Sequence, residues 1–148
     1  MDGPLTGAFP VLRNIYKQTM SAGKYNIVIE QGSTYDVTIE YKDSNSDPID
    51  LTGYSGRMQI RPSIGSPTAY LCLSSSLQAD GTGLNFSGSN GATPPTSGSI
   101  RIYISAVTSS LLTFDQGVYD LEVYSGSYAA RLLQGNVKLS KEVTTGVC

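Results

Sequence analysis

Apolar and polar residues alternate with a period of two in a series of short segments from Lys24 onward. The alternation is clearest in 34–42, where tyrosine, valine and isoleucine take one face and threonine and charged residues take the other. This pattern is typical of a β-strand with one buried side and one solvent-facing side. We expect strands in the following segments: 24–30, 34–42, 55–61, 69–75, 84–87, 99–105, 117–125 and 128–140.

Turn-forming residues separate these segments. The sequence DSNSDP at 43–48 is one such cluster, and the longest is the polar stretch 76–98, which contains a run of glycine, serine, threonine and proline. These residue types favour turns and surface loops. In the last segment the alternation slips between Leu132 and Val137, and Gly135 is the predicted site of a β-bulge.

The period of two also breaks between residues 105 and 114. Ser105 is a residue type that caps helices, so the pattern predicts one short helical turn there. In that turn we expect Val107 and Leu111 to face the core.

The chain has 148 residues, which is enough for one domain and short for two. About eight short strands without a long helical pattern predict an all-β fold, an antiparallel β-sandwich of immunoglobulin-like topology. The sequence has no tryptophan, so the Cys…Trp…Cys landmarks of antibody domains are missing. We divide the chain into an N-terminal arm, 1–22, and a β-sandwich domain, 23–148.

The arm is rich in proline and glycine over its first ten residues and then turns apolar. An apolar strip in a terminal segment needs a covering partner, and we expect a neighbouring subunit to supply it. The alternatives are that the arm packs on its own domain or is a disordered leader. The residues that we expect to form this protein interface are Phe9, Val11, Leu12, Ile15 and Tyr16. The 76–98 loop is a second candidate surface.

Composition argues against several classes of function. The chain has no histidine, which removes Ser-His-Asp and Cys-His catalysis and histidine-based metal sites. A net charge of −2 without a basic cluster argues against nucleic acid as a partner. No stretch approaches the ~20 apolar residues of a membrane span, and the first residues lack the pattern of a signal peptide. We therefore expect no catalytic residues, no cofactor and no membrane partner.

The motifs that could carry chemistry are weak. Asp43, Asn45 and Asp47 have the spacing that opens a calcium loop, but Pro48 replaces the required glycine and Tyr54 the closing glutamate. An ordinary turn is the better interpretation, so we expect no metal site. Carboxylates also pair along two strands, and these pairs have the pattern of a solvated strand face rather than of an acid–base site: Asp36 with Glu40, and Asp120 with Glu122.

The two cysteines do not form a disulfide framework. Cys72 lies in a strand segment, where we expect a buried small side chain, and Cys148 ends the sequence. The sequence requires no bridge between them. The ten tyrosines could form a sugar-binding platform, but four of them fall on the inward phase of strands and are expected in the core or at its rim: Tyr25, Tyr35, Tyr41 and Tyr119.

Three segments together resemble a known family. They are YNIVIEQGSTYDVTIEYKDSNSDPIDLTGYSGRMQIRPS (25–63), GSIRIYISAVTSSLL (98–112) and GVYDLEVYSGSYAARLLQGNVKLSKEVT (117–144). The chain resembles a β-sandwich module of structural proteins of tailed bacteriophages, especially cyanophages, and is similar in style to the N-terminal domain of baseplate upper proteins. In this resemblance LTGY, ending at Tyr54, is a corner into the next strand, with the tyrosine packed beneath it.

The resemblance implies a non-enzymatic protein of the virion that forms a homo-oligomer and binds other phage virion proteins. We expect a multi-copy subunit of the tail, neck or baseplate that attaches fibres or stabilises a junction. A capsid decoration (cement) protein on the phage head is the alternative within this class. A module that recognises host-surface glycan is the alternative outside it.

Overall fold

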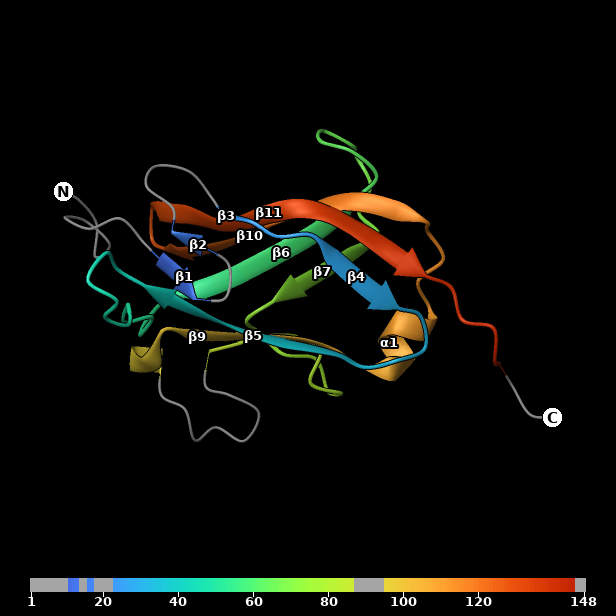
Figure 1. The fold of residues 1–148 in the computed structure, drawn as a ribbon, viewed down its shortest axis with the longest axis horizontal. Coiled ribbons are helices and arrows are strands. Elements are labelled where there is room, and N and C mark those ends of the chain that lie inside the picture. The colour runs from blue at the N-terminus through green and yellow to red at the C-terminus, as the bar shows by residue number, and fades with distance from the viewer. Residues whose placement is uncertain (1–10, 14–15, 18–22, 87–94, 146–148) are drawn as a thin grey trace.

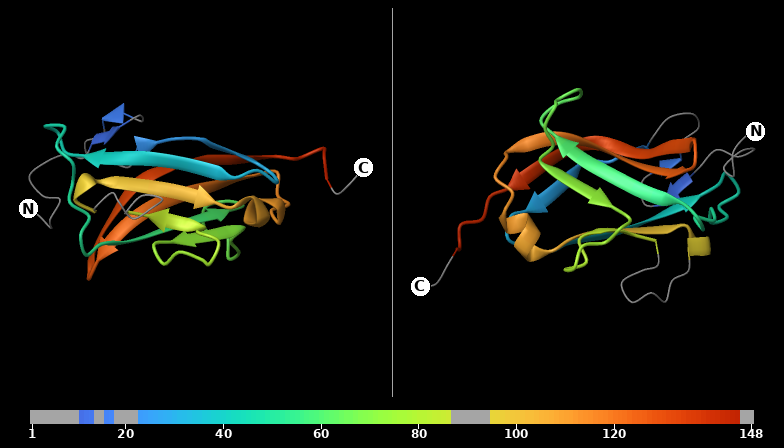
Figure 2. Two further views of the ribbon diagram at one scale, coloured as in Figure 1. Left: turned by 90° about the horizontal axis from the view of Figure 1, so that it is seen from below. Right: turned by 180° about the vertical axis from the view of Figure 1, so that it is seen from behind.

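The computed structural model describes residues 11–13, 16–17, 23–86 and 95–145 as two β-sheets packed face to face (Figure 1, Figure 2). The first sheet has the order β2-β1-β5-β9-β8, with the bounds β1 Val11–Arg13, β2 Tyr16–Lys17, β5 Tyr35–Lys42, β8 Gly83–Asn85 and β9 Ser99–Ile104. The second has the order β3-β11-β10-β6-β7, and β4 also pairs with β11. Its bounds are β3 Gly23–Lys24, β4 Ile27–Glu30, β6 Ser55–Arg61, β7 Leu71–Ser74, β10 Gln116–Ser125 and β11 Tyr128–Ser140.

Two short helical segments complete the fold: a 3-10 turn η1, Pro95–Ser97, and the helix α1, Ala106–Ser110. In the described residues, no helix has the length and hydrophobicity that crossing a membrane requires.

The pairing is antiparallel except where β3 and β4 run parallel to β11. This exception arises because β4 belongs to the second sheet and β5 to the first, so the turn between them crosses from sheet to sheet instead of closing a hairpin. Gly32 makes that turn with a φ of +85°, a conformation that favours glycine. The expected antiparallel β-sandwich is thus confirmed, with one mixed edge.

The core lies between the two sheets and is built from the inward phase of each strand. Isoleucines dominate the first sheet, where Ile100, Ile102 and Ile104 are fully buried. Leu121 and Met58 lie opposite each other on β10 and β6 of the second sheet. Burying each such side chain contributes about 1.5–3 kcal/mol, so the two inner faces supply most of the driving force for folding.

The helical turn forms where we expect it, but its apolar residues face outward. The Ser105 side chain accepts a hydrogen bond from the N–H of Thr108 and caps α1. Val107 and Leu111 are 71% and 75% exposed, so the expectation that they face the core is wrong. The inward position belongs to Ser109, whose hydroxyl donates to the carbonyl of Ser33 (2.7 Å).

The irregularity in β11 lies three residues before its predicted place. The register of the β10–β11 pair shifts between Leu121 and Glu122, which leaves Leu132 as the extra residue. Leu132 and the following residue, Leu133, are therefore both buried. Gly135 is regularly paired with Tyr119, so the predicted bulge there is wrong.

The prediction that Cys72 is buried is also wrong. Cys72 is exposed on β7, the edge strand of the second sheet. Its neighbour Leu73 takes the inward phase and is 2% exposed, so alternation along the strand turns the cysteine outward.

The tyrosines divide between core and rim, as expected. Tyr41 and Tyr119 are buried, and burial raises the pKa of both hydroxyls. Tyr25 and Tyr35 are partly buried against the core. Tyr54 is buried and meets Tyr128 edge-on, with ring centroids 6.2 Å apart, and its backbone N–H donates to the Leu51 carbonyl (3.0 Å).

Two of these tyrosines differ in whether the buried hydroxyl makes a hydrogen bond. The Tyr119 hydroxyl donates to the carbonyl oxygen of Tyr25 at 2.6 Å. The Tyr54 hydroxyl is buried without a hydrogen-bond partner in the described part of the chain. An unpaired buried polar atom destabilises a fold, whereas a hydrogen-bonded one contributes to its stability.

We therefore expect opposite results from the same chemical change. Tyr54→Phe leaves the free energy of unfolding unchanged or raises it by up to about 1 kcal/mol, because it removes an unpaired hydroxyl. Tyr119→Phe lowers it by about 1–2 kcal/mol, because the Tyr25 carbonyl loses its donor. Urea unfolding followed by circular dichroism measures both. A larger loss for Tyr54→Phe than for Tyr119→Phe would contradict this assignment.

Candidate interaction surfaces

The N-terminal arm extends the first sheet at its edge. Strand β1 pairs antiparallel with β5, placing Leu12 opposite Tyr41, and β2 pairs in turn with β1. Of the predicted interface residues, Val11, Leu12 and Tyr16 lie in these two strands, and Phe9 and Ile15 lie outside the described residues. The arm strand occupies the edge of its own chain here. Its expected passage to a neighbouring subunit stays a prediction.

Three of the paired carboxylates lie in cross-strand ion pairs, and Glu40 pairs instead with Lys42 on its own strand (3.6 Å). Asp36 accepts two hydrogen bonds from Arg101 on β9, both 2.8 Å, and these bonds hold the pKa of its carboxyl below the usual range. Glu122 accepts from the Arg57 guanidinium on β6. Both of these cross-strand pairs join neighbouring strands on an outer face, as the solvated-face interpretation of these residues expects.

Asp43 is used as a turn acceptor. Its Oδ1 atom accepts from the backbone N–H groups of Asn45 (2.9 Å) and Asp47 (3.0 Å). Both donors belong to the spacing that resembled a calcium loop, so the carboxylate organises the turn itself. Within the described residues, no three metal-ligating side chains gather in one place.

A second carboxylate, Asp80, links the loop after β7 to the N-terminus of α1 through hydrogen bonds. It accepts from the hydroxyls of Ser105 (2.6 Å) and Thr108 (3.1 Å) and from the backbone N–H of Thr82 (2.9 Å). These hydrogen bonds, with that from Ser105 the strongest, hold the pKa of the Asp80 carboxyl well below its usual range. No local sequence pattern predicts this contact, because Asp80 lies 25 residues before Ser105, the N-cap of the helix.

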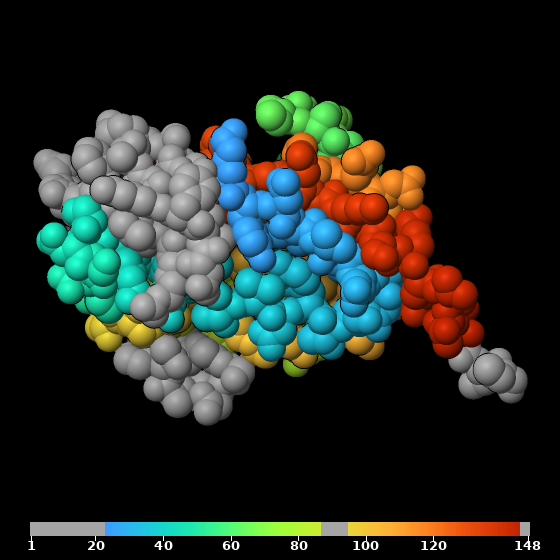
Figure 3. All heavy atoms as spheres, in the orientation of Figure 1, coloured from blue at the N-terminus to red at the C-terminus, as the bar shows by residue number. Residues whose placement is uncertain are grey.

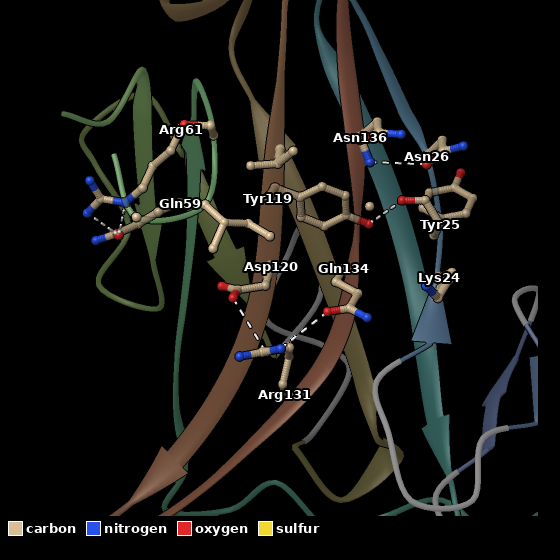
Figure 4. A pocket seen from close by; sticks show the side chains of 15 residues that line it. Lys24, Tyr25, Asn26, Gln59, Arg61, Tyr119, Asp120, Arg131, Gln134 and Asn136 are labelled. Carbon is tan, nitrogen blue, oxygen red and sulfur yellow. Dashed lines mark hydrogen bonds and ion pairs between the residues drawn. The ribbon is translucent and has the colours of Figure 1, made fainter. Parts of the chain in front are cut away.

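The outer face of the second sheet carries a groove of about 720 Å³. Its floor is formed by outward-facing residues of β6, β10 and β11, and its walls by segments 24–26 and 63–65. In Figure 4, Gln59 and Arg61 lie on one side and Tyr25 and Asn26 on the other. The loop that contributes residues 63–65 stands out from the surface in Figure 3.

The wall at residues 24–26 is held firmly against β10 and β11. The Tyr25 carbonyl accepts from Tyr119, and the Asn26 side chain accepts from the backbone N–H of Asn136 (3.0 Å). Gly135 permits this approach, because a Cβ atom there would collide with the Tyr25 carbonyl oxygen. This close contact, rather than the predicted bulge, is the reason that position 135 requires a glycine.

The groove was not among the predicted surfaces. Its signal is the amide and charged residues on the outward phase of two strands, Gln59 and Arg61 on β6 and Gln134 and Asn136 on β11. Finding it requires knowing that β10 lies between these two strands. The alternation along a single strand does not supply that neighbour relation.

No protein-family model and no curated protein matches the sequence. A solved structure titled "Marsupial T cell receptor" is 15% identical, with a TM-score of 0.48, and the match covers 95% of this chain and 54% of that one. The chain thus spans about half the length of the receptor chain. A structure of titin domain M7 is 10% identical, with a TM-score of 0.41, and the match covers 92% of this chain and 96% of that one.

These likenesses concern the arrangement of strands. The expected fold class, an all-β sandwich of immunoglobulin-like type, is confirmed by the two packed sheets. A shared strand arrangement does not determine what a chain binds, which depends on the residues on its own surfaces.

Proposed function

We propose that this chain is a non-enzymatic structural protein of a tailed-phage virion. In this proposal several copies assemble at a junction of the tail, neck or baseplate, and each copy contacts its neighbour through the N-terminal arm. The resemblance of segments 25–63, 98–112 and 117–144 to phage structural modules supports the virion assignment. The arrangement of the arm strand supports the mode of assembly.

The pairing of β1 with β5 is the observation that carries the proposal. The pair is formed by backbone groups of Val11–Arg13 and the last three residues of β5, Glu40–Lys42. Every copy of the chain has the same β5 edge, so a strand that fits its own edge fits that of a neighbour in the same register. Exchange of the arm between copies therefore links subunits and requires no new contact.

Cross-strand ion pairs are consistent with a structural role for the outer faces. Arg101 with Asp36 and Arg57 with Glu122 join strands of the same sheet, and both pairs are partly exposed. Their charges are balanced within the chain. Ion pairs of this kind stabilise the sheet register.

Disulfide trapping tests the exchange directly. Val11 lies opposite Lys42, and facing residues in antiparallel strands have Cα atoms about 4.5–5.5 Å apart, within the range of a disulfide. One chain carries Val11→Cys and a second carries Lys42→Cys, both in a background without Cys72 and Cys148. After mixing and oxidation we expect a covalent pair of about 31 kDa, twice the mass of one chain.

The matched control replaces the second cysteine site with Lys138→Cys, which is exposed on the other sheet. This pair of chains should not cross-link. A double variant, Val11→Cys with Lys42→Cys in one chain, completes the test. If it closes only within its own chain and the mixed single variants stay separate, the arm does not exchange and the proposal fails.

A further inference from the structure

One arginine in the groove differs from the others whose side chains the structure describes. Arg57, Arg101 and Arg131 each lie against a carboxylate, those of Glu122, Asp36 and Asp120 respectively. Arg61 instead donates to two neutral oxygens, Oε1 of Gln59 (2.7 and 3.2 Å) and the carbonyl of Ser66 (2.9 Å). Its positive charge is therefore not balanced by a carboxylate within the described residues.

Arg61 is also held in place. Three of its five N–H groups make the contacts with Gln59 and Ser66, which fix the guanidinium at the side of the groove (Figure 4). Two N–H groups remain available for an incoming oxygen. A fixed, partly buried guanidinium without a counter-charge favours an anion, and a carboxylate matches its planar fork best.

The rest of the groove suits hydroxyl groups. Gln134, Asn136 and Gln59 carry side-chain amides, which both donate and accept, and Asp120 accepts. Arg131 lies between Asp120 (3.4 Å) and Gln134 (3.2 Å) and keeps further donors of its own. A hydroxyl needs both kinds of partner, since it donates one hydrogen bond and accepts others.

The floor of the groove disfavours recognition by strand addition. Strand β10 is paired on both sides by β6 and β11, β6 also pairs with β7, and β11 also pairs with β3 and β4. In the described residues, β6 and β10 thus have partners on both sides, and the edge strand β3 borders the groove only at Lys24. We therefore expect side chains to supply most of the recognition, and the Asp120 carboxylate disfavours a uniformly acidic peptide.

We propose that this groove binds a short acidic oligosaccharide, with a sugar carboxylate on Arg61 and ring hydroxyls on Gln59, Gln134 and Asp120. The volume of about 720 Å³ lies within the range of small-ligand sites. The groove is formed within one chain, so this inference does not depend on the exchange of the arm.

Nuclear magnetic resonance titration of the full chain tests the inference. The probes are an oligogalacturonate, a sialylated oligosaccharide, and a neutral galactose oligosaccharide of equal length. We expect an acidic sugar to shift backbone amide signals of residues 59–65, 118–120 and 131–136 at millimolar concentration. The neutral sugar should bind at least about tenfold more weakly, since it lacks the charge-assisted bond to Arg61. The acidic sugar that binds more tightly identifies the source of the carboxylate.

Variants assign the effect to Arg61. Arg61→Gln should weaken binding of the acidic sugar at least about tenfold, while Arg57→Gln, on the same strand but outside the groove, changes it less than about twofold. Gln59→Glu supplies an internal carboxylate beside Arg61 and should weaken binding like Arg61→Gln while keeping the fold. Circular dichroism melting checks that all three variants are folded.

Several results would overturn the proposal. One is the absence of shifts in the groove with both acidic sugars. Another is equal binding of the neutral sugar, or equal loss in Arg57→Gln and Arg61→Gln. An oligoglutamate peptide that binds the groove more tightly than either sugar would also overturn it and indicate a protein partner.

Discussion

A chain that carries Gly98→Ala is expected to lose about 3–5 kcal/mol of unfolding free energy, combining backbone strain with a steric clash. Gly98 has a φ of +70°, where an L-residue with a Cβ atom is strained. A Cβ atom there would also collide with the carbonyl oxygen of Tyr41 and lie 3.1 Å from backbone atoms of Ile49. These are backbone atoms, so no side chain can rotate away.

The position of Gly98 makes this clash costly. Its carbonyl accepts from the N–H of Tyr41 (2.8 Å), and its N–H donates to Pro95 (3.3 Å), immediately before β9 begins. Displacing Gly98 therefore loosens the start of β9 and the backbone around Ile49. Since whole domains are stable by only about 5–15 kcal/mol, this one methyl group removes a large share of the total.

Gly53→Ala is the matched control. Gly53 has a similar φ of +81°, but a Cβ atom there meets nothing within 4 Å. We expect a loss of about 1–2 kcal/mol, from backbone strain alone. Urea unfolding followed by circular dichroism compares the two variants. Equal losses would show that the clash with Tyr41 adds nothing and that the backbone relaxes around it.

Alternation along single strands predicted most of the architecture. The segments 55–61 and 128–140 coincide with β6 and β11, because each strand has one buried face and one solvent-facing face. The cap at Ser105 was also predictable, since it depends on a local hydrogen bond to Thr108. In these cases the information lies within a few residues of the element.

The wrong predictions share a different cause. Val107 and Leu111 were assigned to the core by their hydrophobicity, but the hydroxyl of Ser109 finds partners on the turn between β4 and β5 and takes the inward position. Gly135 was assigned to a bulge, but it is needed for the approach of Tyr25. In both cases the outcome depends on contacts with a segment about 75 or more residues away in the sequence. A pattern of neighbouring residues carries no information about such contacts.

The groove was hidden for a similar reason. Arg61 and Gln134 lie on strands that are far apart in sequence, and only the order β11-β10-β6 brings them to one face. The arm, by contrast, was recognisable from its own composition. Its pairing with β5 adds the register within one chain, and exchange of that strand between copies is our proposal.

Removing the arm should lower the oligomeric mass of the protein in solution, while the β-sandwich stays folded. All the buried apolar residues that the structure describes lie between Ile27 and Leu139, so a chain that begins at Met20 keeps the core. It loses β1 and β2, the strands that we propose to exchange. We therefore expect a folded monomer, with the circular dichroism spectrum of a β-sheet protein.

Light scattering of the full chain beside the chain that begins at Met20 tests whether the arm joins copies. We expect the full chain to form a species of several times 15.7 kDa. The shorter chain should be a monomer of about 14 kDa, in proportion to its 129 of 148 residues. Two monomers would contradict assembly of copies through the arm and point to another virion protein as its partner. A shorter chain that stays multimeric, or that fails to fold, would contradict the assigned role of the arm outright.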